Sequence, residues 1–254
     1  DARLAKFAAI PDKKRRTYAA MLSAMDDNIG RVRQALKESG QEGRTLVCFI
    51  SDNGGPVMNG TTTNGSANAP LRGSKRTTLE GGIRVPFLVA WPDRIKPAVY
   101  DQPVVQLDLP ATALAAAGLE APADRRLEGV DLLPFLTGKT KGAPHDALYW
   151  RFGQQMAVRA GDFKLVRYDG NVDTLTGARN QPPSGLKLYN LAADIGETRD
   201  LAAAMPGKVR ELQAKWDTWN AGNVKPLWGA QHLEGGTGES GAAKKRAKKK
   251  VTQP

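Results

Sequence analysis

Apolar residues near the start of the chain recur at the spacing of an α-helix. One helical stripe collects Tyr18, Met21, Leu22, Met25, Ile29, Val32 and Leu36. Charged residues lie mostly off this stripe, and Gly40 follows it as a C-terminal stop signal. The pattern therefore predicts an amphipathic helix that ends before Gly40.

Residues 45–50 form a short and nearly unbroken apolar run that is rich in strand formers. Such a run is typical of a buried parallel strand, and a helix followed by a buried strand favours α/β layering. Residues 51–82 contain many Gly, Asn, Thr and Ser residues and almost nothing apolar. We expect a long loop there, and loops of that length are usually functional or disordered.

The next apolar segment, residues 85–91, reads as a strand in which Pro86 suits an edge or a first position. A helix is predicted from Asp108 through Ala117, closed by Gly118. The first part of the chain thus continues the alternation of strand and helix.

After about residue 144 the pattern changes to short strand-like runs. They cover residues 147–152, 155–160, 163–168 and 186–191, and the second and third are joined by the turn pair Gly161-Asp162. An antiparallel meander is predicted, followed by a helix that begins near Pro206. We expect an α/β core over residues 1–143, a smaller α+β unit over 144–228 and a disordered Gly- and Lys-rich tail over 229–254.

The composition is that of a globular protein, with 41% hydrophobic and 25% charged residues among 254. The net charge is +11, but a run of Lys and Arg at 244–250 supplies six of these charges. No aromatic residue interleaves with that run, so a solubilising tail is favoured over a specific nucleic-acid site. The single cysteine, Cys48, excludes an internal disulfide, and no apolar run approaches the roughly 20 residues of a membrane span. The first residues show no initiator Met and no signal pattern, which suggests a chain cut from a longer one.

Asp52, Asn53, Gly54 and Gly55 directly follow the strand predicted over residues 45–50. The carboxyl end of such a strand is where ligands gather in open α/β sheets. A carboxylate and an amide oxygen are hard donors that suit Ca²⁺ or Mg²⁺, and the glycines allow a sharp turn. The same four residues also make a good turn without a ligand, so the local sequence leaves both interpretations open.

Three longer strings carry a family resemblance. Residues 51–55, 70–75 and 80–87 read Ser-Asp-Asn-Gly-Gly, Pro-Leu-Arg-Gly-Ser-Lys and Glu-Gly-Gly-Ile-Arg-Val-Pro-Phe. In this order and spacing they resemble the type I sulfatases, and shorter matches extend the resemblance over about residues 10 to 220. The resemblance implies the C-terminal half of an alkaline-phosphatase-like sulfatase fold.

By this resemblance, Asp52 and Asn53 are ligands of a divalent metal, usually Ca²⁺ with Mg²⁺ as the alternative, and Lys75 contacts the sulfate group. An ammonium and a metal ion can together stabilise the charge that develops on ester oxygens. The implied substrate is a sulfated small molecule or glycan, and the implied location is periplasmic or extracellular.

Neighbouring residues have structural interpretations. We expect Arg72 to be structural or solvated rather than bound to an anion, and Glu80 to cap or brace the loop rather than act in catalysis. His145 is expected at the surface or between the two units. Cys48, inside a predicted buried strand, is expected to be an inert thiol.

The family's formylglycine nucleophile arises within Cys/Ser-x-Pro-Ser-Arg, and no such string occurs in these 254 residues. No catalytic residue is therefore assigned. The sequence predicts a sulfuric ester hydrolase fragment that is inactive alone. The alternatives are a phosphate or phosphonate ester hydrolase of the same superfamily, and a non-catalytic anion- or glycan-binding module.

Overall fold

The structure, a computed structural model, describes residues 2–58, 63–121, 124, 127–170 and 182–224. A short helix α1 (Ala2–Ala5) precedes the long helix α2 (Lys13–Glu38). The Asp12 carboxylate accepts a hydrogen bond from the Arg15 N–H at 2.6 Å and caps α2. The predicted helix is confirmed, and this cap extends it beyond the start of the apolar stripe.

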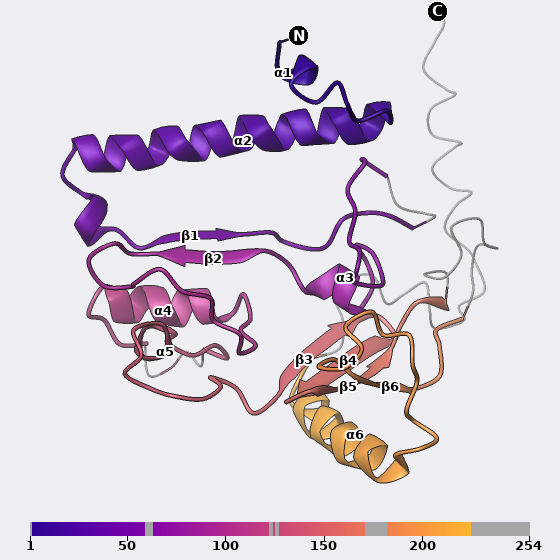
Figure 1. Ribbon diagram of the computed structural model, residues 1–254. Helices are drawn as coiled ribbons and strands as arrows, with labels where there is room; N and C mark the ends of the chain where they lie inside the picture. The colour runs from indigo at the N-terminus through magenta and orange to yellow at the C-terminus, as the bar shows by residue number, and fades with distance from the viewer. Residues whose placement is uncertain (1, 59–62, 122–123, 125–126, 171–181, 225–254) are drawn as a thin grey trace, which may run out of the picture.

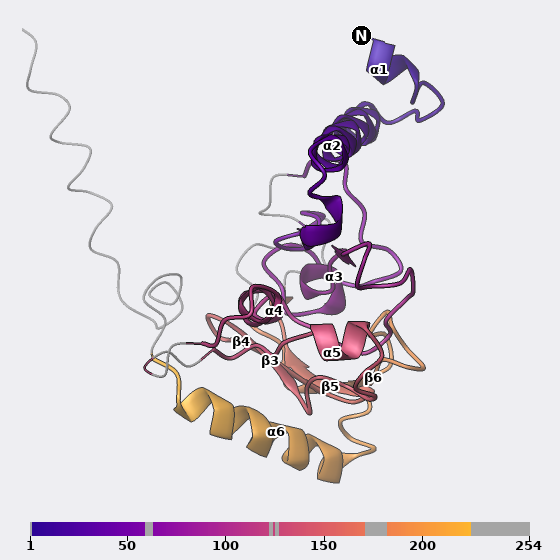
Figure 2. The ribbon, with the colours of Figure 1, turned by 90° about the vertical axis from the view of Figure 1, so that its left-hand side faces the viewer.

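Helix α2 lies along one edge of the molecule, beside the first two strands (Figures 1 and 2). Ala20 is its only buried residue, whereas Met21 is 66% and Val32 is 61% exposed. The apolar stripe predicted from the sequence therefore faces outward over much of its length.

Strands β1 (Val47–Ile50) and β2 (Phe87–Ala90) pair antiparallel, with Val47 opposite Ala90 and Ile50 opposite Phe87. The prediction of a buried parallel strand at residues 45–50 is wrong for this sheet. The long loop after β1 reverses the chain, so β2 returns beside β1 in the opposite direction. Side chains of both strands are partly exposed, including Cys48.

The predicted loop contains one short helix that the sequence pattern did not indicate, α3 (Glu80–Ile83). Two further helices follow β2, namely α4 (Asp108–Ala116) and α5 (Leu133–Leu136). Helix α4 ends before Gly118, which adopts φ +70° as the sequence predicted for a helix stop.

Four antiparallel strands form a second sheet in the order β3-β4-β5-β6, which confirms the predicted meander. Their bounds are Leu148–Phe152, Gln155–Ala160, Phe163–Arg167 and Lys187–Asn190. Gly161 takes φ +56° in the tight turn between β4 and β5, where a side chain would be unfavourable.

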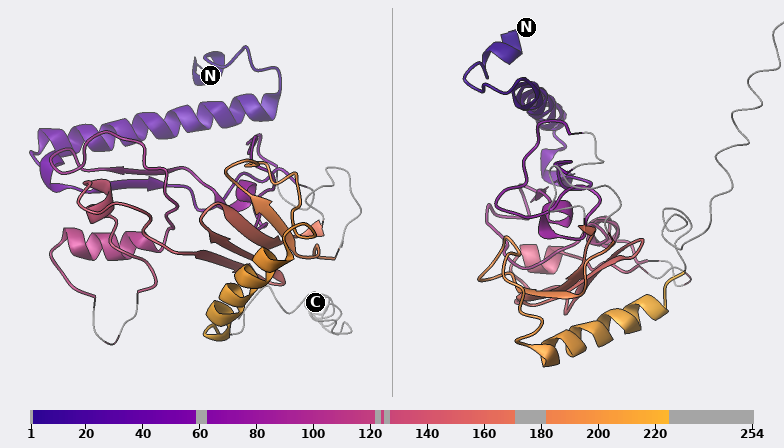
Figure 3. Two further views of the ribbon diagram at one scale, coloured as in Figure 1. Left: turned by 60° about the horizontal axis from the view of Figure 1, so that its bottom comes forward. Right: turned by 90° about the vertical axis from the view of Figure 1, so that its right-hand side faces the viewer.

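Helix α6 (Pro206–Ala221) covers one face of this sheet, and the loop around α3 covers the other (Figures 1 and 3). Alternate residues of each strand serve the two faces. The α6 face buries Met156, Val158, Leu165, Leu188 and Leu212. The loop face buries Leu79, Ala157, Val166, Tyr168, Tyr189 and Leu191. The core of the molecule is thus the four-stranded sheet with a layer on each side.

The division at residue 144 stays a prediction, and the predicted tail at 229–254 lies outside the described residues. Among the helices that the structure describes, none combines the length and the apolar character needed to cross a membrane.

Replacing Leu212 by Ala should lower the free energy of unfolding by about 2–5 kcal/mol, because its fully buried side chain would leave a cavity between α6 and the sheet. Urea denaturation measures this. Leu119→Ala is the control, because Leu119 is 60% exposed and its loss should change stability by less than about 0.5 kcal/mol. Equal losses in the two variants would contradict the role given to α6.

Candidate active site

The turn after β1 holds the two candidate metal ligands. The Ser51 N–H donates to the Pro86 carbonyl at 3.2 Å, so the pairing with the incoming β2 strand continues to the edge of the turn. Asp52 Oδ1 accepts from the Asn53 N–H at 3.0 Å, and Asn53 Nδ2 donates to the Gly54 carbonyl at 2.9 Å. The Asp52 side chain is exposed and Asn53 is half-buried, so their oxygens lie at the surface of this strand end.

Gly54 fastens this turn to α3. Its N–H donates to the Gly82 carbonyl at 2.9 Å, and a Cβ added at Gly54 would lie 1.8 Å from the Gly81 carbonyl oxygen. No other residue fits that approach. This close approach explains why glycines occupy both segments that meet there, Gly54 in the turn and Gly81 and Gly82 in α3.

Lys75 is brought to the same turn through its backbone. The Lys75 N–H donates to the Gly55 carbonyl at 3.1 Å. Asn68 reinforces the contact, because its Oδ1 accepts from the Gly55 N–H at 2.8 Å while its Nδ2 donates to the carbonyls of Gly55 and Gly73, both at 2.9 Å. The structure thus joins the segments that carry Asp52, Asn53 and Lys75, and the Lys75 side chain is exposed.

The donor set suits a hard divalent cation only in part. Asp52 offers a carboxylate and Asn53 an amide oxygen, the ligand types that Ca²⁺ and Mg²⁺ prefer. Two donors do not complete a shell of six or more oxygens. Within the described ranges, no three His, Cys, Asp or Glu residues cluster in a way that could hold a metal ion.

Arg72 points away from this turn and into the four-stranded sheet. Its guanidinium lies 4.8 Å from the centre of the Tyr168 ring and donates to the Tyr168 hydroxyl at 2.8 Å. Nη1 donates to the Glu197 carbonyl at 2.7 Å and to the Tyr189 hydroxyl at 3.3 Å. These contacts favour the structural interpretation of Arg72.

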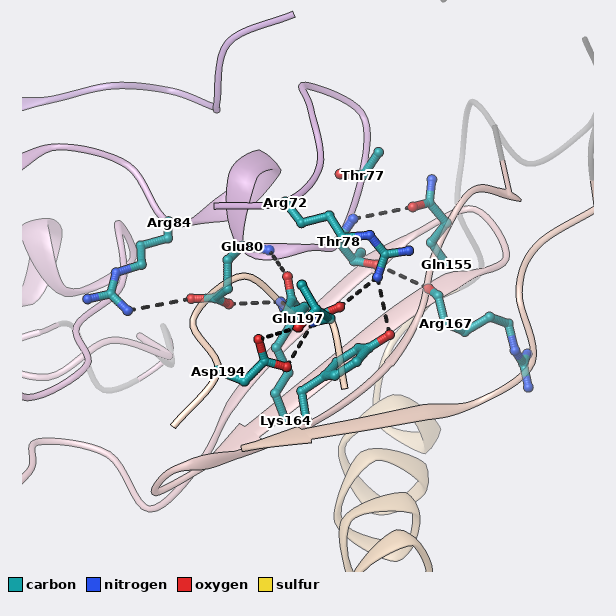
Figure 4. A network of polar contacts seen from close by, with 12 residues as sticks. Arg72, Thr77, Thr78, Glu80, Arg84, Gln155, Lys164, Arg167, Asp194 and Glu197 are labelled. Carbon is teal, nitrogen blue, oxygen red and sulfur yellow. Dashed lines mark hydrogen bonds and ion pairs between the residues drawn. The ribbon is translucent and has the colours of Figure 1, made fainter. Parts of the chain in front are cut away.

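Glu80 opens α3 and is buried (Figure 4). Its Oε1 lies 2.8 Å from Lys164 Nζ, and its Oε2 lies 3.8 Å from Arg84 on the rim. The Glu80 N–H donates to Glu197 Oε2 at 2.7 Å. Burial opposes ionisation, but Lys164, together with Arg159 and Arg84, outweighs it and lowers the pKa of Glu80. The bracing interpretation of Glu80 is therefore favoured over catalysis.

Lys164 and Glu197 complete this buried group, and sequence reasoning gave neither of them a role. Lys164 Nζ lies 2.9 Å from Glu197 Oε1, and both side chains are inaccessible to solvent. Burial raises the pKa of Glu197, and Lys164 offsets this only in part. The sequence did carry one sign of this group, which is a lysine among the apolar residues of the strand Phe163–Arg167. A lysine buried in such a strand requires a partner of opposite charge.

Gln155 adds a further attachment that the sequence did not indicate. Its Oε1 accepts from the N–H groups of Thr78 and Asp169 at 3.3 and 3.1 Å, and its Nε2 donates to the Arg76 carbonyl at 2.9 Å. Thr78 Oγ1 also donates to the Arg167 carbonyl at 3.1 Å. The loop between Arg72 and Glu80 is therefore fastened to the sheet along its length.

The described contacts of His145 are with Asp108 and include none with Asp52, Asn53 or Lys75. His145 Nε2 lies 2.9 and 3.0 Å from the two carboxylate oxygens of buried Asp108, which also accept from the Val105 and Val130 N–H groups. This pairing gives His145 a structural role. Cys48 is exposed rather than buried as predicted, and partial burial of its thiol raises the pKa of that group.

Two family models match the chain. One, described as Sulfatase, matches residues 3–119. The other, described as N-sulphoglucosamine sulphohydrolase, C-terminal, matches residues 73–215. Together they cover both the candidate site and the four-stranded sheet.

Individual relatives agree with these models. The uncharacterized sulfatase YdeN of Escherichia coli (strain K12) is 35% identical over 222 residues, which cover 77% of this chain and 39% of that protein. Arylsulfatase A of Bos taurus is 33% identical over 201 residues, 72% of this chain and 38% of that protein. The chain thus spans less than two fifths of the length of either relative.

Among solved structures, Ps i-CgsB superposes with a TM-score of 0.76 at 31% identity, covering 92% of this chain and 49% of that chain. The neighbours include several sulfatases. The predicted alkaline-phosphatase-like fold class is confirmed by this likeness.

Replacing Gly54 by Ala should destabilise the protein by about 1–3 kcal/mol, because the added methyl group would collide with the Gly81 carbonyl. Urea denaturation again measures the change. Gly30→Ala is the matched control, since Gly30 lies within α2 with nothing within 4 Å, and it should stabilise by about 0.5–1 kcal/mol. A Gly54→Ala variant as stable as the parent would disprove the tight contact.

The contribution of Glu197 to the stability of the chain should fall as the pH rises above 4.5, the ordinary pKa of a glutamate, because folded Glu197 has a raised pKa and holds its proton longer than the unfolded chain does. Glu197→Gln should reduce this decline. The free energy of unfolding, measured in urea between about pH 4 and pH 8, tests the point. Glu211→Gln, an exposed glutamate paired with Lys208, is the control and should follow the parent curve; parallel curves for all three proteins would refute the prediction.

Proposed function

The chain belongs to the sulfatase family, and from that membership we propose that it supplies metal-binding and sulfate-binding residues to a sulfuric ester hydrolase. Asp52 and Asn53 are the proposed ligands of Ca²⁺, with Mg²⁺ as the alternative. Lys75 is the proposed contact to the sulfate group. The metal, when bound, withdraws charge from the ester oxygens as a Lewis acid.

One observation carries the proposal. The backbone of Lys75 is hydrogen-bonded to Gly55, two residues after Asn53, and Asn68 bridges the same two segments. An exposed ammonium and two exposed or half-exposed hard oxygen donors are therefore presented from one tied pair of loops. A sulfate ester bound there would meet the positive charges of the Lys75 ammonium and the proposed metal ion in fixed positions. Charges placed in advance in this way stabilise the transition state of ester hydrolysis.

We further propose that the chain does not hydrolyse sulfate esters by itself. No Cys/Ser-x-Pro-Ser-Arg string occurs among its 254 residues, and Cys48 is followed by Phe49-Ile50-Ser51. The two donors also leave a metal shell incomplete. In this proposal, the nucleophile and the remaining ligands come from a longer protein that includes this chain.

The proposed substrate is a sulfated small molecule or glycan, and the proposed location is periplasmic or extracellular. One structure of Ps i-CgsB is a complex with k-i-k-neocarrahexaose, which supports a glycan. Hydrolysis of phosphate esters is not favoured, because the curated relatives are sulfatases.

Two assays with 4-nitrophenyl sulfate test the proposal. The 254-residue chain should show no turnover. A longer protein that includes it should hydrolyse the ester, and Lys75→Ala should lower kcat/KM by about 10²–10³-fold if the ammonium stabilises the transition state. In the same longer protein, Asp52→Ala should weaken the binding of Ca²⁺, measured by calorimetry, because it removes a carboxylate ligand.

Lys187→Ala is the control, because Lys187 forms a half-exposed ion pair with Asp200 on the four-stranded sheet. It should leave kcat/KM unchanged. Turnover by the purified short chain would overturn the proposed incompleteness. A longer protein that binds sulfated glycans without cleaving any sulfate ester would favour the non-catalytic binding module instead.

A further inference from the structure

The loop that carries Lys75 is attached on both sides to one residue. Arg72, three positions earlier, donates to the Glu197 backbone carbonyl at 2.7 Å. Glu80, five positions later, donates its N–H to Glu197 Oε2 at 2.7 Å. Figure 4 shows the two attachments converging on Glu197 from opposite ends of the loop. Besides the contacts of Gly55, Asn68 and Gln155 with this loop, the placement of Lys75 therefore depends on where Glu197 is held.

Glu197 is itself held in an unusual backbone conformation. Its φ is +52°, in the left-handed region that residues with a side chain rarely adopt. Its N–H donates to the Asp194 carbonyl at 3.2 Å, and the Asp194 carboxylate accepts from the N–H groups of Thr198 and Arg199, both at 2.8 Å. Backbone strain of this kind persists only where surrounding contacts over-determine it. The turn from Asp194 to Arg199 supplies those contacts.

Lys164, on strand β5 of the four-stranded sheet, holds the side chain of Glu197 by an ion pair. It lies on the face of β5 that points toward α3, and its ammonium contacts both Glu80 Oε1 at 2.8 Å and Glu197 Oε1 at 2.9 Å. The group contains two carboxylates and one lysine, with Arg84 at its rim. Buried ions rarely stabilise a protein more than well-packed apolar residues would, but they demand one geometry. The arrangement is therefore suited to setting position rather than to adding stability.

We propose that Glu197, with Lys164, is a positioning residue that fixes the loop from Arg72 to Glu80 and so sets the place of Lys75. The proposal rests on the function proposed above for Lys75. We call Glu80, Lys164 and Glu197 the ion group. If the ion group had only a general structural role, its loss would loosen the whole sheet. The proposal instead expects the effect to be confined to the loop from Arg72 to Glu80.

Hydrogen–deuterium exchange of the 254-residue chain, followed by mass spectrometry, separates these roles. The main variant carries Glu80→Gln, Lys164→Met and Glu197→Gln, which keeps the volumes similar and leaves no unpaired buried charge. Exchange of amides in residues 72–84 should become about tenfold faster, as expected when a charge-assisted hydrogen bond is lost. Exchange in β4 and β5 away from Lys164 should stay unchanged.

Lys187→Met is the matched control, since it removes a lysine of the neighbouring strand whose ion pair with Asp200 is half-exposed. It should leave exchange at residues 72–84 unchanged. If the triple variant exchanges faster throughout the sheet, or not faster in the loop, the positioning role is overturned.

Should the triple variant fail to fold, Glu197→Gln decides the matter alone. It keeps the backbone carbonyl for Arg72 and a side-chain oxygen for the Glu80 N–H, and it replaces the oxygen that contacts Lys164 by an uncharged NH2 group that cannot accept from the ammonium. Faster exchange confined to residues 72–84 supports the proposal, and unchanged exchange overturns it.

The outcome is distinguishable from that of the proposed function. If Lys75→Ala leaves ester hydrolysis by the longer protein intact, the sulfate-binding role assigned to Lys75 fails. Faster exchange in the loop would then still show that Glu197 positions residues 72–80, but not for sulfate binding. If Lys75→Ala abolishes hydrolysis while exchange in the loop is insensitive to the ion group, the function holds and the positioning role fails.

Discussion

One buried ammonium group joins the loop before β2 to the four-stranded sheet. Lys164 comes from the middle strand pair of the four-stranded sheet, Glu80 from the loop that leads to β2, and Glu197 from the segment before α6. An ionised carboxylate could not remain in this place without the lysine, because an unpaired buried charge is far costlier than a paired one. The loop can therefore carry exposed polar residues on its outer side while its inner side is tied to a rigid sheet.

Local patterns were sufficient to predict most helices and strands. The meander and α6 follow from alternation, turn glycines and an N-terminal proline, which act over a few residues. The direction and burial of β1 were not predictable in this way. Its apolar residues indicated a strand, but the partner that fixes its direction, β2, returns only after the long loop. The one-turn helix at Glu80–Ile83 was hidden by its two glycines, and it is held by contacts with Glu197 and Gly54 rather than by propensity.

The candidate site divides in the same way. Asp52, Asn53 and Lys75 were recognisable because they stand in short strings whose order resembles a family. Their roles remain predictions. Asn68, Gln155 and Glu197 act through contacts between residues distant in sequence, up to 125 positions apart. Nothing in their immediate sequence marks such contacts, and only Lys164, a charge within an apolar strand, gave a physical signal.

The charge of Lys164 also explains why the loop packs on one particular face of the sheet. Successive residues of a strand point to opposite faces, so a slip of β5 by one residue would turn Lys164 toward α6. That face is lined by apolar residues, among them Leu165, Leu188 and Leu212 in the native register, and would leave the ammonium without a carboxylate. An apolar residue at position 164 would tolerate either register far better. The ion group therefore does more than fasten the loop, because it also selects the register that gives the loop its place.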